Sequence, residues 1–248
     1  MAILVAVSCL AACAPANYPA GGGPGAEPLV ASLEYYPFQV KGYQNSYPRR
    51  KILVLMPVDA HQAASSAAGA GAQSYQGNVP IGVTENVTGR ATEELYSAPL
   101  APVVQNAIRQ AAGEAGLIAV TSAAATYDRA KDLKEDYVLE SRIVRCWVTK
   151  RPGPGGDAGP AWFSTAEFAL EVTIYKPPFV VPFWQGKSGS SYDDPPVDSN
   201  AISPEDETAI YDQPNQVLSV AMTRAVAGIF NRTELYALVN DDRMSARR

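Results

Sequence analysis

The sequence is poor in the residues that most often carry out chemistry, since its 248 residues include one histidine and three cysteines. A single histidine, His61, argues against a metal site built from several imidazoles and against a Ser-His-Asp triad. His61 lies beside an Ala/Gly-rich stretch, where we expect nothing to orient its ring. The glycine-rich segments 69–71 and 153–156 lack the spacing and the following helix of a phosphate-binding loop. We therefore expect no enzyme activity, no cofactor and no metal ion.

Positive charge is also scarce, because 20 Lys and Arg residues face 25 Asp and Glu residues, for a formal net charge of −5. A nucleic-acid partner is therefore not expected, since a phosphate backbone needs a cationic surface. Hydrophobic residues make up 47% of the chain and charged residues 18%, which is typical of a globular protein.

The N-terminal apolar run, residues 2–12, is too short to cross a bilayer, which needs about 20 residues. It ends in Leu10-Ala-Ala-Cys13, which matches the lipobox of bacterial lipoproteins. We expect residues 1–12 to be a signal peptide and Cys13 to carry a diacylglycerol; the alternative is an uncleaved Ala-rich tip. No Lys or Arg precedes the run, so the true start is expected upstream of Met1.

This interpretation leaves no pair of cysteines for an intramolecular disulfide. Cys9 leaves with the signal peptide and Cys13 is blocked by lipid, so Cys146 has no partner. Cys146 lies in an apolar, strand-like run, and we expect a buried, unreactive thiol.

Composition divides the rest of the chain into segments. We expect a flexible tether over 13–31, an aromatic-rich arm over 32–48, one folded domain over 49–240 and a polar tail over 241–248. The arm could pack along the domain or form a partner-binding strip. The domain should contain two long loops, 59–96 and 187–213, the first with a hairpin at 79–90 and the second rich in solvated carboxylates.

Hydrophobic periodicity predicts the main elements of the domain. Helices are expected over 100–116, capped by Ser97, and from about Pro214 onward. Strands are expected over 52–57, 117–120, 136–150, 164–176 and 180–184. The strands 136–150 and 164–176 should form a hairpin, with a bulge near Ile143 where the alternation changes phase. Together these elements predict an α+β sandwich, with a mixed, mostly antiparallel sheet and two main helices on one face.

Two sets of side chains on the expected sheet are candidate sites. Trp147, Trp162 and Trp184 come from neighbouring strand regions, so they could form one cluster, either core or a hydrophobic groove for a peptide or an acyl chain. Charged residues of the hairpin are expected to form cross-strand ion pairs on a solvated face: Glu140, Arg142, Arg145, Glu167 and Glu171.

The order of elements behind a lipobox resembles small bacterial lipoproteins of the YajG-like and ABC-transport-auxiliary type. The segments that carry this resemblance are 51–57, 100–116, 136–140 with Trp147, and 168–174 leading to 184–186. The resemblance implies an α/β sandwich related to the TolB N-terminal domain. It also implies a non-enzymatic envelope protein that assists a larger machine. The long Ala/Gly loop and the acidic insertion depart from it.

The sequence thus favours a lipid-anchored periplasmic accessory protein, attached to the membrane through Cys13 and to an envelope complex through a sheet edge or the tryptophans. Ala14 follows Cys13, and since it is not Asp we expect the outer membrane. The alternative is a carrier that binds a lipid or other apolar ligand on the tryptophan-bearing sheet. The sequence leaves the oligomeric state open.

Overall fold

A long antiparallel hairpin forms the centre of the fold. It consists of β7 (Tyr137–Pro152) and β8 (Ala161–Tyr175). The predicted alternation is confirmed, because Phe168, Leu170 and their even-numbered neighbours from 164 to 174 in β8 are all buried. The predicted bulge is also confirmed, as a register shift between Ile143 and Arg145.

The computed structural model describes residues 30–37, 40, 50–61, 77–127, 133–153, 161–178, 181–193, 197–198 and 204–235. The expected signal peptide, Cys13, most of the expected tether and the expected tail 241–248 lie outside the described residues, as does the segment 62–76.

The hairpin is extended on both sides into one mixed sheet. On the β8 side lie β9 (Pro182–Asp193) and the two-residue β10 (Val197–Asp198), both antiparallel to β8. On the β7 side, three short strands pair parallel to β7 one after another: β2 (Lys51–Val54), β3 (Val58–Asp59) and β4 (Val79–Glu85). Beyond these, β6 (Ile118–Thr121) pairs with β2, β5 (Ala91–Ser97) with β4, and β1 (Val30–Ala31) with β5.

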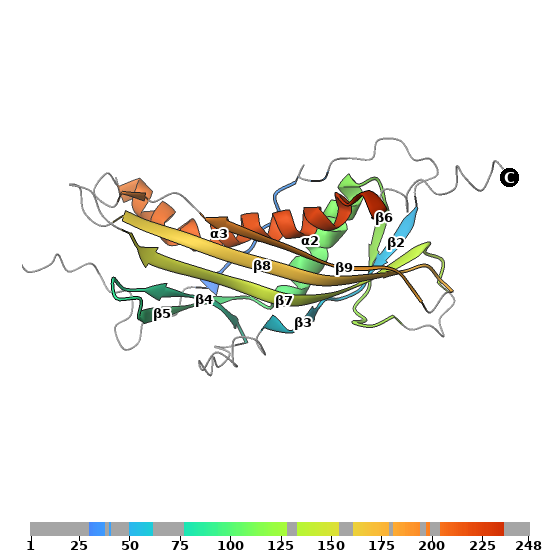
Figure 1. Ribbon diagram of the computed structural model, residues 1–248, viewed down its shortest axis with the longest axis horizontal. Helices are drawn as coiled ribbons and strands as arrows, with labels where there is room; N and C mark the ends of the chain where they lie inside the picture. Colours follow the sequence, from blue (N-terminus) through green and yellow to red (C-terminus); the bar gives the residue numbers. More distant parts are fainter. Residues whose placement is uncertain are drawn as a thin grey trace, which may run out of the picture.

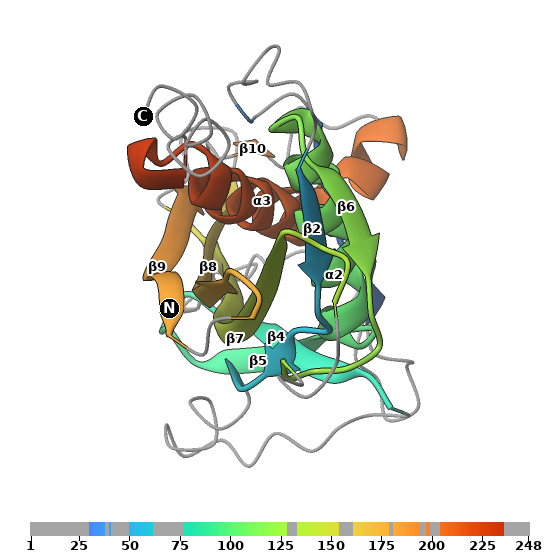
Figure 2. The same cartoon turned by 90° about the vertical axis from the view of Figure 1, so that its right-hand side faces the viewer.

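Two helices cover one face of this sheet (Figure 1). They are α2 (Leu100–Glu114) and α3 (Pro204–Phe230). Viewed from the end, the sheet curves around α3, with β9 on one side and β2 and β6 on the other (Figure 2). The concave face and both helices share one hydrophobic core that includes Ile108, Phe168 and Met222. The predicted α+β sandwich, with two helices on one face and long antiparallel ladders, is confirmed.

The prediction of a loop over 59–96 is wrong for most of the described residues in that range. The antiparallel pair β4 and β5 occupies residues 79–97, so the hairpin expected at 79–90 is longer than predicted. Its turn is held by Asn86, whose Oδ1 accepts hydrogen bonds from the backbone of Thr88 and Arg90, both at 3.0 Å. Ser97 is the last residue of β5 and is buried, so it does not cap α2; the N-cap position is Pro99.

The expected loop 187–213 is also wrong. Strand β9 continues to Asp193, and α3 begins at Pro204, ten residues before the expected start at Pro214. The first turn of α3 contains Glu205, Asp206 and Glu207 in its sequence. Pro214 therefore lies inside the helix.

The N-terminal segments belong to the domain more closely than their composition indicates. Val30 and Ala31, expected to end the tether, form β1, and Ala31 is buried. The described part of the arm then runs along α3. The backbone N–H of Glu34 donates to Ser219 Oγ and that of Tyr36 to Thr223 Oγ1, each at 3.0 Å. Leu33 and Val40 are part of the core.

Candidate functional site

The structure does not bring the three tryptophans together. Trp147 lies opposite Glu167, on the convex face of the β7–β8 hairpin. Trp184 lies opposite Ile174, and Trp162 lies twelve residues further back along β8, at its other end. At about 3.3 Å per residue, these two positions are about 40 Å apart. The expected common surface therefore does not exist among the described residues.

Trp184 packs at the edge of the core, beneath the end of α3. The guanidinium carbon of Arg232 lies 5.5 Å from its ring centroid, and the Arg232 side chain also donates to the carbonyl of Lys187. Nearby, the half-exposed Phe183 meets the buried Tyr137 edge-on, with ring centroids 6.3 Å apart. These contacts attach the start of β9 to the rest of the domain.

Trp162 belongs to a different environment, a row of polar side chains across the concave face. The strand registers place Glu93 beside Thr84, Thr84 beside Lys150, and Lys150 beside Ser164. We call these four residues the polar row. Lys150 Nζ lies 5.7 Å from the centroid of Trp162. The row lies on a face whose buried side chains are mostly apolar, with Ser141 and Ser188 as further polar members.

Burial perturbs both ionisable groups of the polar row. It lowers the pKa of Lys150 to about 8, although the negative charge of Glu93 opposes this shift. It raises the pKa of Glu93, against the positive charge of Lys150. Ser164 is fully buried, and its Oγ has no hydrogen-bond partner among the described residues. An amine and a hydroxyl side by side can hydrogen-bond a carboxylate or a carbonyl oxygen.

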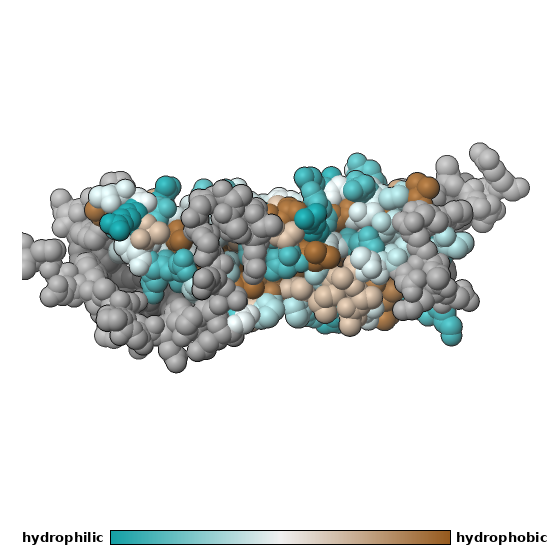
Figure 3. Space-filling view, turned by 90° about the horizontal axis from the view of Figure 1, so that it is seen from below, coloured by the Kyte–Doolittle hydropathy of each residue, from teal (hydrophilic) through white to brown (hydrophobic). Residues whose placement is uncertain are grey.

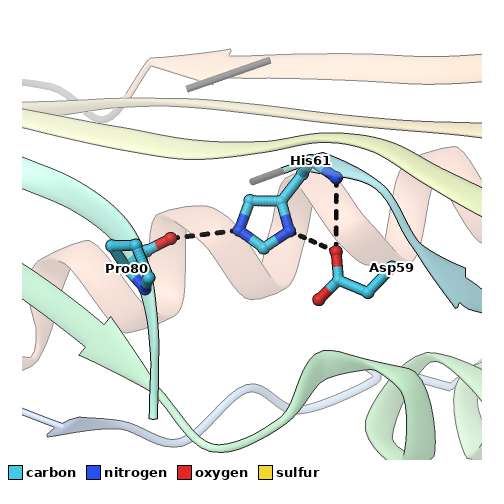
Figure 4. Close-up of polar contacts among 3 residues, drawn as sticks. All are labelled: Asp59, His61 and Pro80. Atoms are coloured by element: carbon cyan, nitrogen blue, oxygen red, sulfur yellow. Dashed lines mark hydrogen bonds and ion pairs between the residues drawn. The ribbon is translucent and has the colours of Figure 1, made fainter. Parts of the chain in front are cut away.

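His61 is oriented after all, in contrast to the prediction from sequence. It is 2% exposed, and its Nδ1 contacts the carboxylate of Asp59 while its Nε2 lies 3.0 Å from the carbonyl oxygen of Pro80 (Figure 4). Burial alone would lower the pKa of His61, but the hydrogen bonds to Asp59 and Pro80 raise it above its ordinary value. Because both ring nitrogens face acceptors, the geometry fits the doubly protonated ring.

The sequence contains half of the signal for this contact. Asp59 and His61 are two residues apart at the end of β3, a spacing that places side chains on the same side of an extended chain. Pro80 comes from β4, on the far side of the segment 62–76, and no local pattern links it to His61. The contact joins β3 to β4 where both strands lie along β7.

Cys146 is buried, as predicted. It lies opposite Phe168 on the concave face. Burial, together with the nearby charge of Asp59, raises the pKa of its thiol far above the ordinary value. The thiolate that would react with oxidants or electrophiles is therefore disfavoured.

The convex face carries cross-strand ion pairs, as expected from sequence. Arg145 Nε lies 2.7 Å from Glu167 Oε2, across the hairpin as predicted. Glu171 pairs with Lys187 of β9, a residue outside the predicted set, at 2.7 Å, and this hydrogen bond lowers the pKa of Glu171. Glu140 accepts a hydrogen bond from the Tyr175 hydroxyl at 3.1 Å.

The described residues offer neither a metal centre nor a membrane-spanning helix. No group of three or more His, Cys, Asp or Glu side chains in that part of the chain could hold a metal ion. No helix of the described segments is long and apolar enough to cross a membrane. On the face shown in Figure 3, hydrophobic side chains are interspersed with hydrophilic ones.

Comparisons with known proteins show only distant likeness. No family model and no curated protein matches the sequence. A DUF330 protein from Xanthomonas campestris is 12% identical, covering 88% of this chain and 99% of its own, with a TM-score of 0.42. A neuraminyllactose-binding hemagglutinin homolog from Helicobacter pylori is 8% identical, covering 87% and 100%, with a TM-score of 0.41. Lipoprotein GNA1162 from Neisseria meningitidis is 13% identical, covering 65% and 95%, with a TM-score of 0.25.

All three TM-scores are below 0.5, so these structures assign neither a family nor a function to the chain. The resemblance to YajG-like and ABC-transport-auxiliary lipoproteins therefore stays a prediction from sequence.

Proposed function

We propose that this chain is a non-catalytic, lipid-anchored protein of the bacterial envelope, held at a membrane through an acylated Cys13. The observation that carries the proposal is Leu10-Ala-Ala-Cys13 at the end of a short apolar run, with a Gly-rich segment between it and β1. A run of 16 residues, 14–29, separates Cys13 from the first strand.

A non-catalytic role is supported by the arrangement of the ionisable groups. His61, the single histidine of the sequence, has a hydrogen-bond acceptor at each ring nitrogen and is buried, so it is poorly placed to accept a proton from a substrate. The Cys146 thiol is buried with a raised pKa. What the domain does offer is a sheet with exposed edges, which suits contact with another protein.

The anchor is tested by labelling cells with an alkyne-bearing fatty acid and by measuring the mass of the mature N-terminus. We expect label on the wild-type chain and none on Cys13→Ala. Cys9→Ser is the matched control, because it changes a cysteine four residues away within the same region and leaves the lipobox intact. An unmodified N-terminus that still carries Met1, or label on the Cys13→Ala chain, would overturn the proposal.

The finer assignment, to the inner leaflet of the outer membrane, rests on Ala14. We expect the wild-type chain to sediment with outer-membrane vesicles in a sucrose gradient and Ala14→Asp to move to the inner-membrane fraction. Equal distributions would remove the basis for this assignment. Crosslinking in cells followed by mass spectrometry tests the accessory role, since an accessory protein should be recovered with a defined envelope complex; recovery of this chain alone would contradict it.

A further inference from the structure

Among the described residues, β9 is the longest edge strand of the sheet. Its twelve residues, Pro182–Asp193, pair with β8 along one side, and among the described residues no other strand pairs with it. An edge of this length presents a row of backbone N–H and C=O groups to which another strand can bind.

The hydrogen bonds within the sheet show which residues of β9 direct their backbone N–H and C=O groups to the open edge. The N–H of Leu55 donates to the carbonyl of Leu139 at 3.0 Å, which directs the backbone polar groups of Leu139 away from β8. Along a strand, the backbone N–H and C=O groups of successive residues point to opposite neighbouring strands. With the registers of β7 with β8 and of β8 with β9, the even-numbered residues of β9 direct these groups toward β8. The odd-numbered residues therefore face the open edge. The hydrogen bond from Arg232 to the carbonyl of Lys187 agrees with this direction.

The open edge of β9 consists of small and charged residues from Lys187 to Asp193. Its outward-facing residues include Lys187, Gly189, Ser191 and Asp193, all exposed. Two of these four are small, so a second backbone could approach closely. The other two carry opposite charges, six residues apart, with the small residues between them.

This order of residues is complementary to itself. If a second β9 runs antiparallel, with the two-fold axis at Ser190, Gly189 of each copy faces Ser191 of the other. In the same register Lys187 faces Asp193, once on each side of the axis. Sliding one strand by two residues places Lys187 opposite Ser191 or beyond the end of the strand, and removes both ion pairs. All four residues direct their backbone groups to the open edge, and Gly189 and Ser191 can therefore exchange two backbone hydrogen bonds on each side of the axis. At the Lys187–Asp193 pairs the Lys187 carbonyl already accepts from Arg232, so the N–H of Lys187 is the group that donates to the second copy.

We propose that two copies of this chain associate through their β9 strands, antiparallel about Ser190, and join their sheets into one. The contact is isologous, since the same strand of each copy forms it across a two-fold axis. Lys187, which is 77% exposed and already pairs with Glu171, then lies between Glu171 of its own chain and Asp193 of the second copy. The proposal does not depend on the lipid anchor.

The proposal is tested by the mass of the full chain in solution, measured by light scattering and sedimentation equilibrium with Cys13→Ser, so that no acyl group drives association. We expect a dimer. Ser191→Pro should give a monomer, because proline removes an N–H that faces the open edge and leaves the bonds to β8 in place. Ser191→Thr, which keeps this N–H, is the matched control and should remain dimeric. A monomeric parent chain, or a dimer that survives Ser191→Pro, would overturn the proposal.

A charge exchange tests the register without a change of backbone. Lys187→Asp and Asp193→Lys should each weaken the dimer by about 10-fold, since each loses two exposed ion pairs and places like charges together. The double variant should restore the affinity, and added salt should narrow the difference between single and double variants. Failure of the double variant to restore association would rule out this register. Circular dichroism of each variant separates a loss of association from a loss of fold.

Discussion

At the scale of single residues, the clearest example of a contact made by tertiary structure is His61. Its two acceptors, Asp59 and the Pro80 carbonyl, are brought to opposite sides of the ring by β3 and β4. A neutral imidazole can donate through only one nitrogen, so this site favours the protonated ring. Sequence alone correctly placed Cys146 in the core, because burial follows from its apolar neighbours, whereas the orientation of His61 depends on a strand 19 residues away.

His61 should make stability depend on pH in a defined direction. Since its folded pKa is raised above 6.5, its contribution is complete below about pH 6.5 and is lost as the pH rises through the folded value. We expect the difference in unfolding free energy between the wild type and His61→Gln to be larger at about pH 5.5 than at about pH 9. Urea unfolding at both pH values measures it, and a difference that does not vary with pH would contradict the assignment.

At the scale of elements, helix α2 shows how burial decides the cost of a substitution. Ile108 is fully buried in the core, whereas Ile118, on the edge strand β6, is 42% exposed. Ile108→Ala should lower the free energy of unfolding by about 2–5 kcal/mol. Ile118→Ala, the same change at an exposed position, should cost no more than about 0.5 kcal/mol. Chemical denaturation of both variants tests this; equal costs would mean that the β6 surface is covered in solution.

The contact between α3 and β9 predicts a coupled pair of substitutions. A Cβ on Gly228 would lie 2.8 Å from Ser188 Oγ, which donates to the carbonyl of Ala225 at 2.6 Å. Replacing Gly by Ala inside a helix ordinarily gains about 1 kcal/mol. We expect this gain for Gly228→Ala only when Ser188→Ala has removed the hydroxyl, and a smaller gain or a loss in the wild-type background.

A double-mutant cycle of these two substitutions, followed by thermal or urea unfolding, measures the coupling. Additive effects would show that the helix shifts away from β9 at no cost, contrary to the close approach seen here.

The elements that sequence predicted well are those whose pattern is local. The regular alternation of β8 and the apolar face of α2 each repeat over several turns or pleats, and both were found where expected. Strand β9 was predicted too short because its second half, rich in Gly and Ser, has no apolar alternation; it is a strand because β8 supplies hydrogen bonds along its length. The start of α3 was missed because an acidic stretch followed by Pro214 is typical of a loop.

At the scale of the whole molecule, the folded domain includes residues nearer the N-terminus than the expected start at residue 49. Strand β1 joins the sheet through β5, and the segment after it follows α3 and places Leu33 and Val40 in the core. Low apolar periodicity concealed this, because the arm makes single contacts along a helix rather than forming a helix or long strand of its own.

Truncation tests whether the domain begins at β1 or near residue 50. A chain that begins at residue 29 should unfold like the full chain, whereas one that begins at residue 50 should be markedly less stable. The loss should reach several kcal/mol, since each buried aliphatic side chain contributes about 1.5–3 kcal/mol. Urea midpoints of the two shortened chains test this, and equal midpoints would place the arm outside the domain.

Because of the bulge in β7, the effect of deleting a residue depends on its position in that strand. Val144 is the additional residue, because Ile143 faces Leu170 while Arg145 already faces the next residue of β8. A chain lacking Val144 would keep Val148 and Lys150 directed inward, since its two strands would then count residue for residue. A chain lacking Trp147 would instead turn Val148 and Lys150 to the water. Loss of a residue at the bulge therefore leaves the remaining side chains of β7 on their original faces. Loss of a residue elsewhere moves the side chains beyond it to the opposite face of the sheet.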